Sequence, residues 1–182
     1  MKILLAVDGS TTSCQAAQAL AHFAPSEQII MLTVMDIPNV DYQSLWLQMK
    51  DLPDIVEREM RRDAQTILDR LQARLPSPNS SLSPQIKKGK PAEVILDVAA
   101  QKKIDLIVIG ARGLNRLSEL VFGSVSHKVM THASCSTLIV KSPIPRIQHV
   151  LLPVEGVEDT QRAMTFFENT PFEKSPFISV VH

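Results

Sequence analysis

The sequence has no excess of charge of either sign. Its 182 residues include 19 lysines and arginines and 19 aspartates and glutamates, and the basic residues are scattered rather than grouped in a run. Proteins that bind nucleic acids or anionic membrane surfaces usually present a basic patch or stripe. We therefore expect neither a nucleic acid nor a membrane among the partners of this chain.

Long hydrophobic runs and paired cysteines are also missing. No segment approaches the roughly 20 consecutive apolar residues that span a bilayer, and the apolar run at the amino terminus is short and ends at Asp8, unlike that of a signal peptide. The sequence therefore predicts a cytoplasmic protein. The two cysteines, Cys14 and Cys135, lie far apart without CxxC spacing. This argues against a disulfide framework or a structural zinc site and favours two small buried side chains.

The chain does contain a large apolar fraction arranged in alternating patterns. Hydrophobic residues make up 45% of the sequence, enough for the core of an ordinary domain. Strand-like runs occupy residues 2–7, 28–35, 82–89, 105–110 and 136–141, and helix-like patterns occupy residues 11–25, 54–75, 91–103 and 124–133. Alternation of this kind indicates βαβ units. We expect an α/β fold, with an open five-stranded parallel sheet and helices on both of its faces.

Two of the predicted helices carry more detailed expectations. The first comes after a turn, and Thr11, Thr12 or Ser13 is expected to cap it. The helix over residues 54–75 is expected to bury one apolar face, made of Ile55, Val56, Met60, Ala64, Ile67, Leu68, Leu71 and Leu75. The single tryptophan and the single tyrosine precede this helix, either as a satellite packing cluster or as a lid or dimer contact.

The end of the chain repeats its beginning. Residues 149–182 align without gaps on residues 2–35, with strand, acid-Gly turn, helix and second strand in the same order. We therefore expect a full domain over residues 1–142, a linker over residues 143–146, and the first βαβ of a second domain over residues 147–182. So few elements cannot bury a parallel strand pair. This tail is expected to dock on its own first domain, to pair with a symmetry-related copy, or to be a remnant of a tandem protein.

Polar and small residues stand at the ends of two of the predicted strands. Asp8 comes directly after the first strand, and Gly110 ends the fourth. Because open parallel sheets bind ligands beyond the carboxyl ends of their strands, both residues belong at the ligand-binding edge. Gly110 and Gly113 lack a Cβ, so the backbone there is free to turn sharply against a flat or bulky ligand. Asp8 suits either a ribose hydroxyl or a turn before Gly9.

A glycine and a serine then open the last helix of the first domain. Gly123 precedes Ser124, Val125 and Ser126, whose N–H groups would converge at the positive end of the helix dipole. The hydroxyls of both serines are candidate phosphate donors. Arg112, Arg116 or Lys128 would partly neutralise the phosphate charge. The chain has neither GxxxxGK[ST] nor GxGxxG after its first strand, which argues against an ordinary kinase or dinucleotide site.

Taken together, these segments resemble the universal stress protein family. The match rests on "GARGLNRLSELVFGS", which fits Gly-x2-Gly-x9-Gly-Ser, and on "KILLAVDGS". It covers residues 1 to about 142, and the tail is similar to the start of a second family domain. Ser136 stands where the family more often has proline after a cysteine, beyond the expected phosphate contacts. The resemblance implies a sheet order of 3-2-1-4-5, a homodimer, and bound ATP with Mg²⁺.

The resemblance also implies a set of nucleotide-binding residues. Ala6, Asp8 and Val34 would flank adenine and ribose; Gly110, Ala111, Arg112 and Gly113, with Leu114, Asn115 and Arg116 in the same segment, would line the ribose and phosphates; and Gly123, Ser124, Val125 and Ser126 would hold the phosphates. No catalytic residue and no dedicated metal site stand out among them.

The leading hypothesis is an ATP-binding regulatory protein in which nucleotide changes the loop over residues 114–122 and, through it, a dimer surface. Any hydrolysis is expected to be slow, since His127 is the only histidine near the phosphates and is expected to face solvent. The alternative is a stress-response interaction module that works without nucleotide. An adenylating enzyme ranks last, because "DGSTTS" lacks the paired glycines of a pyrophosphate loop.

Overall fold

The computed structural model describes residues 1–23, 26–37, 52–75, 81–111, 122–169 and 172–181. The strands are β1 (Lys2–Ala6), β2 (Gln28–Met35), β3 (Ser81–Lys88), β4 (Leu106–Gly110), β5 (Ser136–Val140), β6 (His149–Pro153) and β7 (Phe177–Val181). The helices are α1 (Thr11–Ala19), continued by the 3-10 turn η1 (Leu20–His22), α3 (Leu52–Gln72), α4 (Pro91–Lys102), α5 (Ser124–His132) and α6 (Gly156–Asn169). No helix within these ranges is long and apolar enough to cross a membrane.

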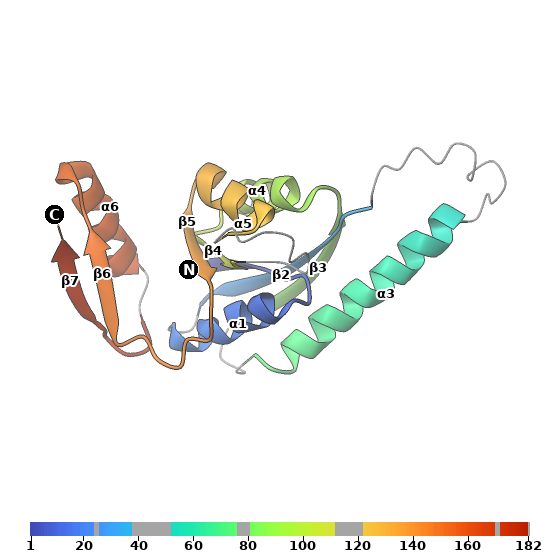
Figure 1. The fold of residues 1–182 in the computed structure, drawn as a ribbon, viewed down its shortest axis with the longest axis horizontal. Helices are drawn as coiled ribbons and strands as arrows, with labels where there is room; N and C mark the ends of the chain where they lie inside the picture. The colour runs from blue at the N-terminus through green and yellow to red at the C-terminus, as the bar shows by residue number, and fades with distance from the viewer. Residues whose placement is uncertain (24–25, 38–51, 76–80, 112–121, 170–171, 182) are drawn as a thin grey trace.

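Five strands form one parallel sheet in the order β3-β2-β1-β4-β5, which confirms the expected fold class and order (Figure 1). β1 lies at the centre, where it pairs with β2 on one side and β4 on the other. The chain therefore leaves β1 in one direction for β2 and β3 and returns on the opposite side for β4 and β5. This reversal places the switch point between β1 and β4.

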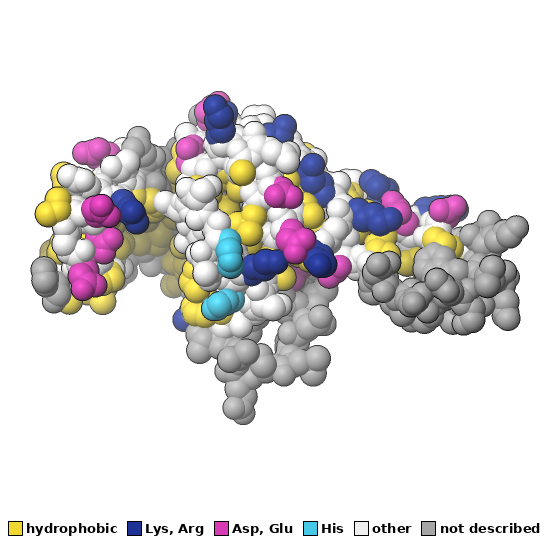
Figure 2. Space-filling view, turned by 90° about the horizontal axis from the view of Figure 1, so that it is seen from above, with side chains coloured by type: hydrophobic (Ala, Val, Ile, Leu, Met, Phe, Trp, Pro, Cys, Tyr) yellow, Lys and Arg dark blue, Asp and Glu magenta, His cyan; other side chains and the backbone are white. Residues whose placement is uncertain are grey.

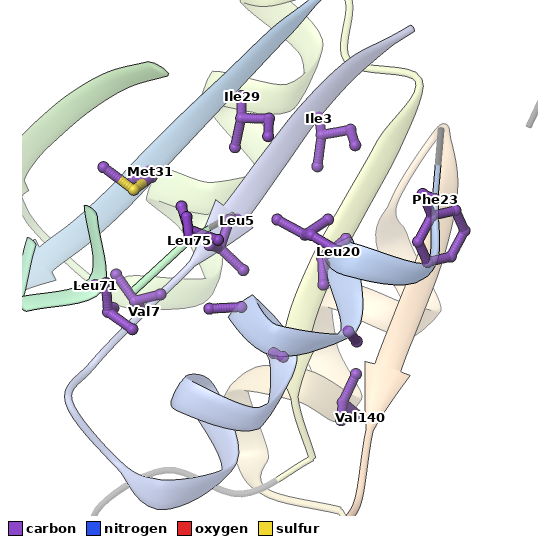
Figure 3. Close-up of a cluster of buried hydrophobic side chains, with 14 of the residues drawn as sticks. Ile3, Leu5, Val7, Leu20, Phe23, Ile29, Met31, Leu71, Leu75 and Val140 are labelled. Atoms are coloured by element: carbon purple, nitrogen blue, oxygen red, sulfur yellow. The ribbon is translucent and has the colours of Figure 1, made fainter. Parts of the chain in front are cut away.

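Two apolar layers cover the two faces of this sheet. Ile3, Leu5 and Val7 of the β1 segment point into a cluster with α1 and α3 (Figure 3). Leu4 and Ala6 alternate with them and point into the cluster of α4 and α5. Because both faces are covered, nearly every β1 side chain is buried. Each fully buried leucine or isoleucine contributes about 1.5–3 kcal/mol to folding.

The cap of α1 differs from the one expected. Ser10 is the N-cap residue, and its Oγ accepts a hydrogen bond from the Ser13 N–H at 3.2 Å. Asp8 shapes the same turn, because its Oδ1 accepts from the Ser10 N–H at 3.0 Å. The helix therefore begins at Thr11, one residue after its cap.

Only part of the predicted apolar face of α3 is buried. Ala64, Leu68 and Leu71 are buried, but Ile55 is 48% and Val56 is 40% exposed among the described residues. The periodicity predicted the helix correctly, but the expected extent of its burial was wrong. A helix of 21 residues is about 31 Å long, and its amino-terminal half extends past the sheet edge (Figure 1). The tryptophan and tyrosine ahead of it lie outside the described residues.

The two cysteines are partly rather than fully buried. Cys14 packs beside the α1–α3 cluster and Cys135 beside the α4–α5 cluster, both as free thiols. Burial raises the pKa of the Cys135 thiol, and the nearby Asp105 carboxylate adds to that effect. The expectation of two fully buried small side chains is therefore met only in part.

The tail forms a β6-α6-β7 unit whose two strands are parallel. The gap-free alignment is wrong by two residues in its second half: Lys2 pairs with Gln28, whereas His149 pairs with Phe177. A shift of two preserves which face each side chain takes. The unit touches the five-stranded body at one end, where the Phe23 and Phe172 rings lie 5.4 Å apart.

Candidate functional site

A small pocket opens at the carboxyl edge of the sheet, at the switch point between β1 and β4. Eleven described residues line it: Ala6, Val7, Asp8, Ser13, Leu32, Val34, Pro91, Ile95, Ile109, Gly110 and Val125. They enclose about 80 Å³, below the roughly 300–1,000 Å³ of a typical ligand site. These residues therefore account for the inner end of a site rather than for all of it.

The pocket is an apolar slot with one carboxylate at its mouth. Part of the lining comes from strand side chains such as Ala6, Val34 and Ile109. Another part comes from residues of α4 such as Ile95. Apolar walls of this kind suit a flat, weakly polar ring. Asp8 is half-buried and lines the pocket while its Oδ1 holds the turn at Ser10. The turn role of Asp8 is thus present, and the carboxylate is also in place to accept from a ligand hydroxyl.

Gly110 is required by the protein itself. A Cβ placed on it would lie 2.7 Å from the Thr12 carbonyl carbon and 2.8 Å from the Ser13 N. The end of β4 therefore packs directly against the first turn of α1. The sequence pattern explains this glycine by close approach of a ligand, and the structure adds a packing reason that no local pattern could reveal.

The start of α5 supplies backbone donors. The Gly123 N–H donates to the Ala111 carbonyl at 2.7 Å, and the first bond within the helix runs from the His127 N–H to the Gly123 carbonyl at 2.9 Å. The N–H groups of Ser124 and Val125 lie in the first turn, ahead of that bond. A helix start of this kind favours anions.

Ser126 has a structural role that the sequence pattern did not reveal. Its side chain is 3% exposed, and its Oγ donates to the Ala111 carbonyl at 2.8 Å, with the Gly123 carbonyl at 3.0 Å. A hydroxyl has a single hydrogen to donate. The Ser126 hydroxyl therefore fastens the helix start to the end of β4. Its expected contact with the phosphates stays a prediction.

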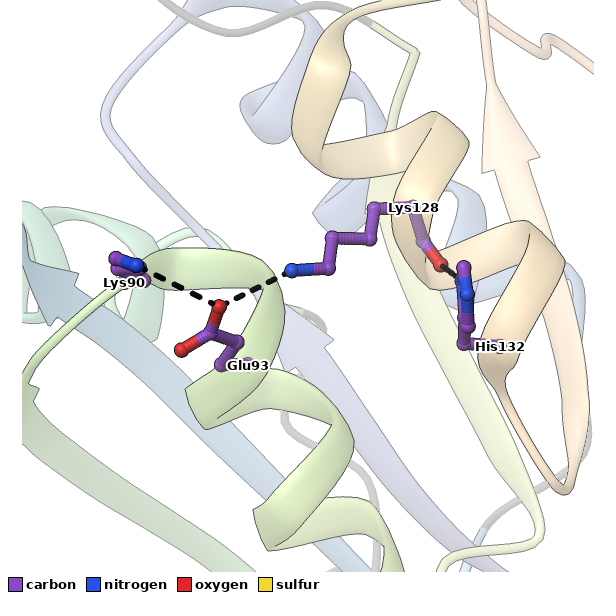
Figure 4. A network of polar contacts seen from close by, with 4 residues as sticks. All are labelled: Lys90, Glu93, Lys128 and His132. Carbon is purple, nitrogen blue, oxygen red and sulfur yellow. Dashed lines mark hydrogen bonds and ion pairs between the residues drawn. The ribbon is translucent and has the colours of Figure 1, made fainter.

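Lys128 also lies elsewhere than expected. Its Nζ is 3.1 Å from Glu93 Oε1, so it links α5 to α4 on the outer surface, while Lys90 Nζ lies 3.9 Å from the same oxygen (Figure 4). The hydrogen bond with Lys128, and then the charges of Lys128 and Lys90, hold the pKa of Glu93 below 4.5. Lys128 thus neutralises Glu93 rather than a ligand.

The predicted residues fall into three groups. Ala6, Asp8, Val34, Gly110 and Val125 line the pocket; Ala111, Gly123, Ser124 and Ser126 form the junction at the start of α5; and Arg112, Gly113, Leu114, Asn115 and Arg116 lie outside the described residues. The sequence reasoning missed the other lining residues of the pocket, which are Val7, Ser13, Leu32, Pro91, Ile95 and Ile109. Pro91 at a helix start was visible in the sequence, but its distance from β1 was not.

Comparisons with known proteins agree with this geometry. The model of the universal stress protein family matches residues 1–141. A universal stress protein of Thermus aquaticus is 34% identical over 76% of this chain and 97% of its own length. Universal stress protein YxiE of Bacillus subtilis is 29% identical over 77% of this chain and 98% of its own length.

Solved structures share the fold. A universal stress protein in complex with cAMP has a TM-score of 0.58 at 21% identity, covering 78% of this chain and 97% of its own. An Arabidopsis thaliana family protein with AMP bound has a TM-score of 0.54 at 19% identity, covering 77% and 90%. A universal stress protein from Archaeoglobus fulgidus has a TM-score of 0.68 at 18% identity. It covers 92% of this chain and 61% of its own, so the match extends into the tail.

Proposed function

The chain belongs to the universal stress protein family, and we propose that it is an ATP-binding regulatory protein of the stress response. Nucleotide occupancy would act on the loop over residues 114–122, of which residues 114–121 lie outside the described residues, and through it on a dimer surface. The observation that carries the proposal is the apolar slot at the switch point, with Asp8 at its mouth and the start of α5 beside it.

Each part of the slot fits one part of a nucleotide. Ala6, Val34 and Ile109 offer apolar walls for adenine. Asp8 offers a carboxylate for ribose hydroxyls but would repel phosphates. The phosphates would therefore lie toward the N–H groups of Ser124 and Val125, and Mg²⁺ would accompany them, bound mainly through phosphate oxygens.

Two observations support an adenine nucleotide as the ligand. Family proteins with this fold have been solved with cAMP and with AMP bound, so the fold accepts that chemical class. The described slot also has the apolar inner end that a base needs. ATP itself, rather than a monophosphate, is proposed from the Gly-x2-Gly-x9-Gly-Ser motif at residues 110–124.

Hydrolysis, where it occurs, is proposed to be slow and incidental. Rapid hydrolysis needs a base positioned on the attacking water. His127, the histidine next to the Gly-Ser segment, is exposed on α5. No residue is therefore assigned a catalytic role.

We propose the same domain organisation as the sequence indicated, with residues 1–142 as a family domain, residues 143–146 as a linker and residues 147–182 as the first βαβ of a second one. The parallel β6-α6-β7 arrangement and the structural match that extends into the tail support this division. A homodimer is part of the proposal.

The second candidate is an interaction module that works without nucleotide. The small volume enclosed by the described residues is the observation that favours it. Calorimetry with Mg²⁺-ATP, after an assay for adenine nucleotide retained through purification, separates the two. Binding at micromolar strength is expected for the switch, and no binding by a folded sample would leave the interaction module.

The test variant is Gly123→Val. Gly123 has φ −73° and ψ 160°, extended backbone that valine adopts readily, so the fold should be retained. The branched side chain would stand at the phosphate end of the site and should abolish binding. Ala133→Val is the matched control, because Ala133 caps the opposite end of α5 with φ −67° and ψ 137°. Equal affinity in the two variants would refute the site assignment.

A further inference from the structure

A lysine stands at the carboxyl edge of the sheet, where it contacts an aromatic ring instead of a carboxylate. Lys141 comes directly after β5 and is exposed. The ion pairs among the described residues all involve other cations. The Lys141 Nζ lies 4.5 Å from the centre of the Phe122 ring, a cation–π contact. Its charge is therefore balanced by no carboxylate in the described part of the chain.

Two other lysines near this edge are neutralised. Lys90 and Lys128 lie on either side of the Glu93 carboxylate, at 3.9 Å and 3.1 Å from the same oxygen. Seen from above, many basic side chains of the five-stranded body lie beside acidic ones (Figure 2). Lys141 differs from these lysines, because its ammonium group is held by a ring that carries no net charge. An anion would find it ready to pair.

Backbone hydrogen bonds place Lys141 and Phe122 beside the start of α5. The Val140 carbonyl accepts from the Ala111 N–H at 2.8 Å, and the Ala111 carbonyl accepts from the Gly123 N–H at 2.7 Å. Lys141 follows the first residue of this series, and Phe122 precedes the last. The contact between their side chains therefore lies next to a helix start, where free N–H groups favour an anion.

The strand also directs this lysine toward α5. Val140 is buried and points into the α1–α3 cluster (Figure 3). Successive side chains of an extended segment point to opposite faces, and α5 packs on the other face of the sheet. The stem of Lys141 is flexible and four carbons long. Rotation of the side chain alone is sufficient to carry the ammonium group from the Phe122 ring toward the N–H groups of Ser124 and Val125.

We infer that Lys141 exchanges partners when nucleotide binds: it rests on the Phe122 ring until then, and afterwards binds the outer phosphates. The inference rests on the proposed function and deepens it, because it names a cation for the phosphates and a route by which occupancy reaches Phe122. A charge-assisted hydrogen bond to phosphate is stronger than an exposed cation–π contact, so the phosphates win this competition. Phe122, the last residue of the loop over residues 114–122, is thereby released.

The first test is calorimetry of Mg²⁺-ATP and of AMP with the full chain and with Lys141→Met, which keeps an unbranched side chain and removes the charge. The dissociation constant for ATP is expected to rise at least about tenfold, because the outer phosphates lose their cation. That for AMP, which has no outer phosphates, is expected to change by less than about threefold. Lys141→Arg keeps the charge and should restore most of the ATP affinity.

Lys102→Met is the matched control. Lys102 is exposed in the last turn of α4, whereas Pro91 at the first turn of that helix lines the pocket. The control therefore removes the same charge at the far end of α4. Both dissociation constants are expected to stay within about twofold, since salt screens exposed charges beyond about 10 Å.

A second variant tests the exchange itself. Phe122→Leu keeps an apolar side chain and removes the ring, so Lys141 no longer has to leave a partner before it binds phosphate. The ATP affinity is expected to rise by about two- to fivefold, which is the fold-change that corresponds to an exposed cation–π contact. A lower ATP affinity in Phe122→Leu would mean that the ring contact belongs to the bound state, which overturns the exchange.

Two results with Lys141→Met also overturn the inference. Equal losses of ATP and AMP affinity would mean that the lysine only supports the start of α5, and unchanged ATP affinity would mean that it never meets the phosphates. Failure of the proposed function is a different result, because the folded unmodified chain would then bind neither nucleotide. In that case this inference falls with it.

Nuclear magnetic resonance of the protein labelled with ¹³C-lysine follows Lys141 directly. Protons above an aromatic ring are shifted upfield, so the Lys141 ε-methylene signal, identified by its loss in Lys141→Arg, should lie upfield of the other lysines. Saturating Mg²⁺-ATP is expected to return it to their position, and AMP to leave it upfield. A signal that stays upfield when ATP is bound would show that the lysine keeps its ring, and would overturn the inference.

Discussion

The two βαβ units of this chain have similar patterns and opposite surroundings. In the first, β1 is buried on both faces, and Leu4 is 0% exposed. In the second, β6 alternates between exposed and half-buried residues, and Leu151, the counterpart of Leu4, is 66% exposed. The difference lies in the elements that pack on each unit. β4, α4 and α5 complete the first sheet, and no described element takes their place on the second. An apolar strand pattern therefore predicts a strand, but it does not show whether other elements pack on that strand.

The largest expected effect lies at the centre of the first sheet. Leu4→Ala should lower the free energy of unfolding by about 2–5 kcal/mol, because it leaves a cavity between two covered faces. Leu151→Ala should change it by less than about 0.5 kcal/mol, because its side chain is already in solvent. Urea unfolding of both variants at low protein concentration measures the difference. Equal losses would mean that Leu151 is covered in solution.

An intermediate effect on stability is expected at the glycine that follows the first strand of each unit. Gly9 has φ +79° and Gly156 has φ +82°, so alanine is strained by about 1 kcal/mol at either position. At Gly9 a Cβ would also lie 3.0 Å from Ile67 Cδ1, whereas nothing lies within 4 Å of one at Gly156.

Gly9→Ala should therefore cost more than Gly156→Ala, by up to about 1 kcal/mol. Urea unfolding reports the first variant, and amide exchange along α6 reports the second. A larger loss at Gly156 would show that the carboxyl end of β6 is crowded in solution.

The smallest effect on stability is expected at the contact between α4 and α5, which pack only on the first sheet. The Glu93 carboxylate joins α4 to α5 through Lys128 (Figure 4), and its pKa is held below 4.5 by that contact. Since the folded pKa is depressed, the stabilisation is present above pH 4.5 and is lost as pH falls through the folded value.

Glu93→Gln should therefore lower the melting temperature slightly near neutral pH. The gap from the unmodified protein should close in acid. Both side chains are about half exposed, so solvent screens the pair and the effect is small. Melting curves at a series of pH values test this, and a gap that widens in acid would contradict it.

Periodicity and turn chemistry predicted most of the fold. The run QIIMLTVM matched β2 residue for residue, and Pro91 marked the start of α4. Local sequence rules were less reliable where several neighbouring residues are able to cap the same helix. Ser10 took the cap that Thr11, Thr12 and Ser13 were expected to provide, because the Asp8 turn positions its hydroxyl one residue earlier.

Only some residues of the candidate site were predictable from the sequence. Asp8, Gly110 and Val125 stood out, because strand ends and helix starts are visible in a sequence. Ile95 was not recognised, since nothing local shows that α4 and the end of β1 line the same pocket. Ser126 was expected to contact the phosphates, because a hydroxyl at a helix start is able to donate to a ligand. The same hydroxyl is able to donate to a backbone carbonyl, and the sequence does not show that the Ala111 carbonyl lies within reach.

The amino-acid sequence alone was enough to specify which residues form strands and helices, the parallel order of the first sheet through its family motif, and the edge at which small and acidic residues gather. Those features depend on local sterics and on hydrophobic periodicity, which the chain carries at every point. The folded arrangement was needed to establish which apolar faces are covered, that Gly110 serves the contact with α1, and that Lys128 pairs with Glu93. Such outcomes depend on elements distant in sequence, so two similar βαβ patterns ended in opposite environments.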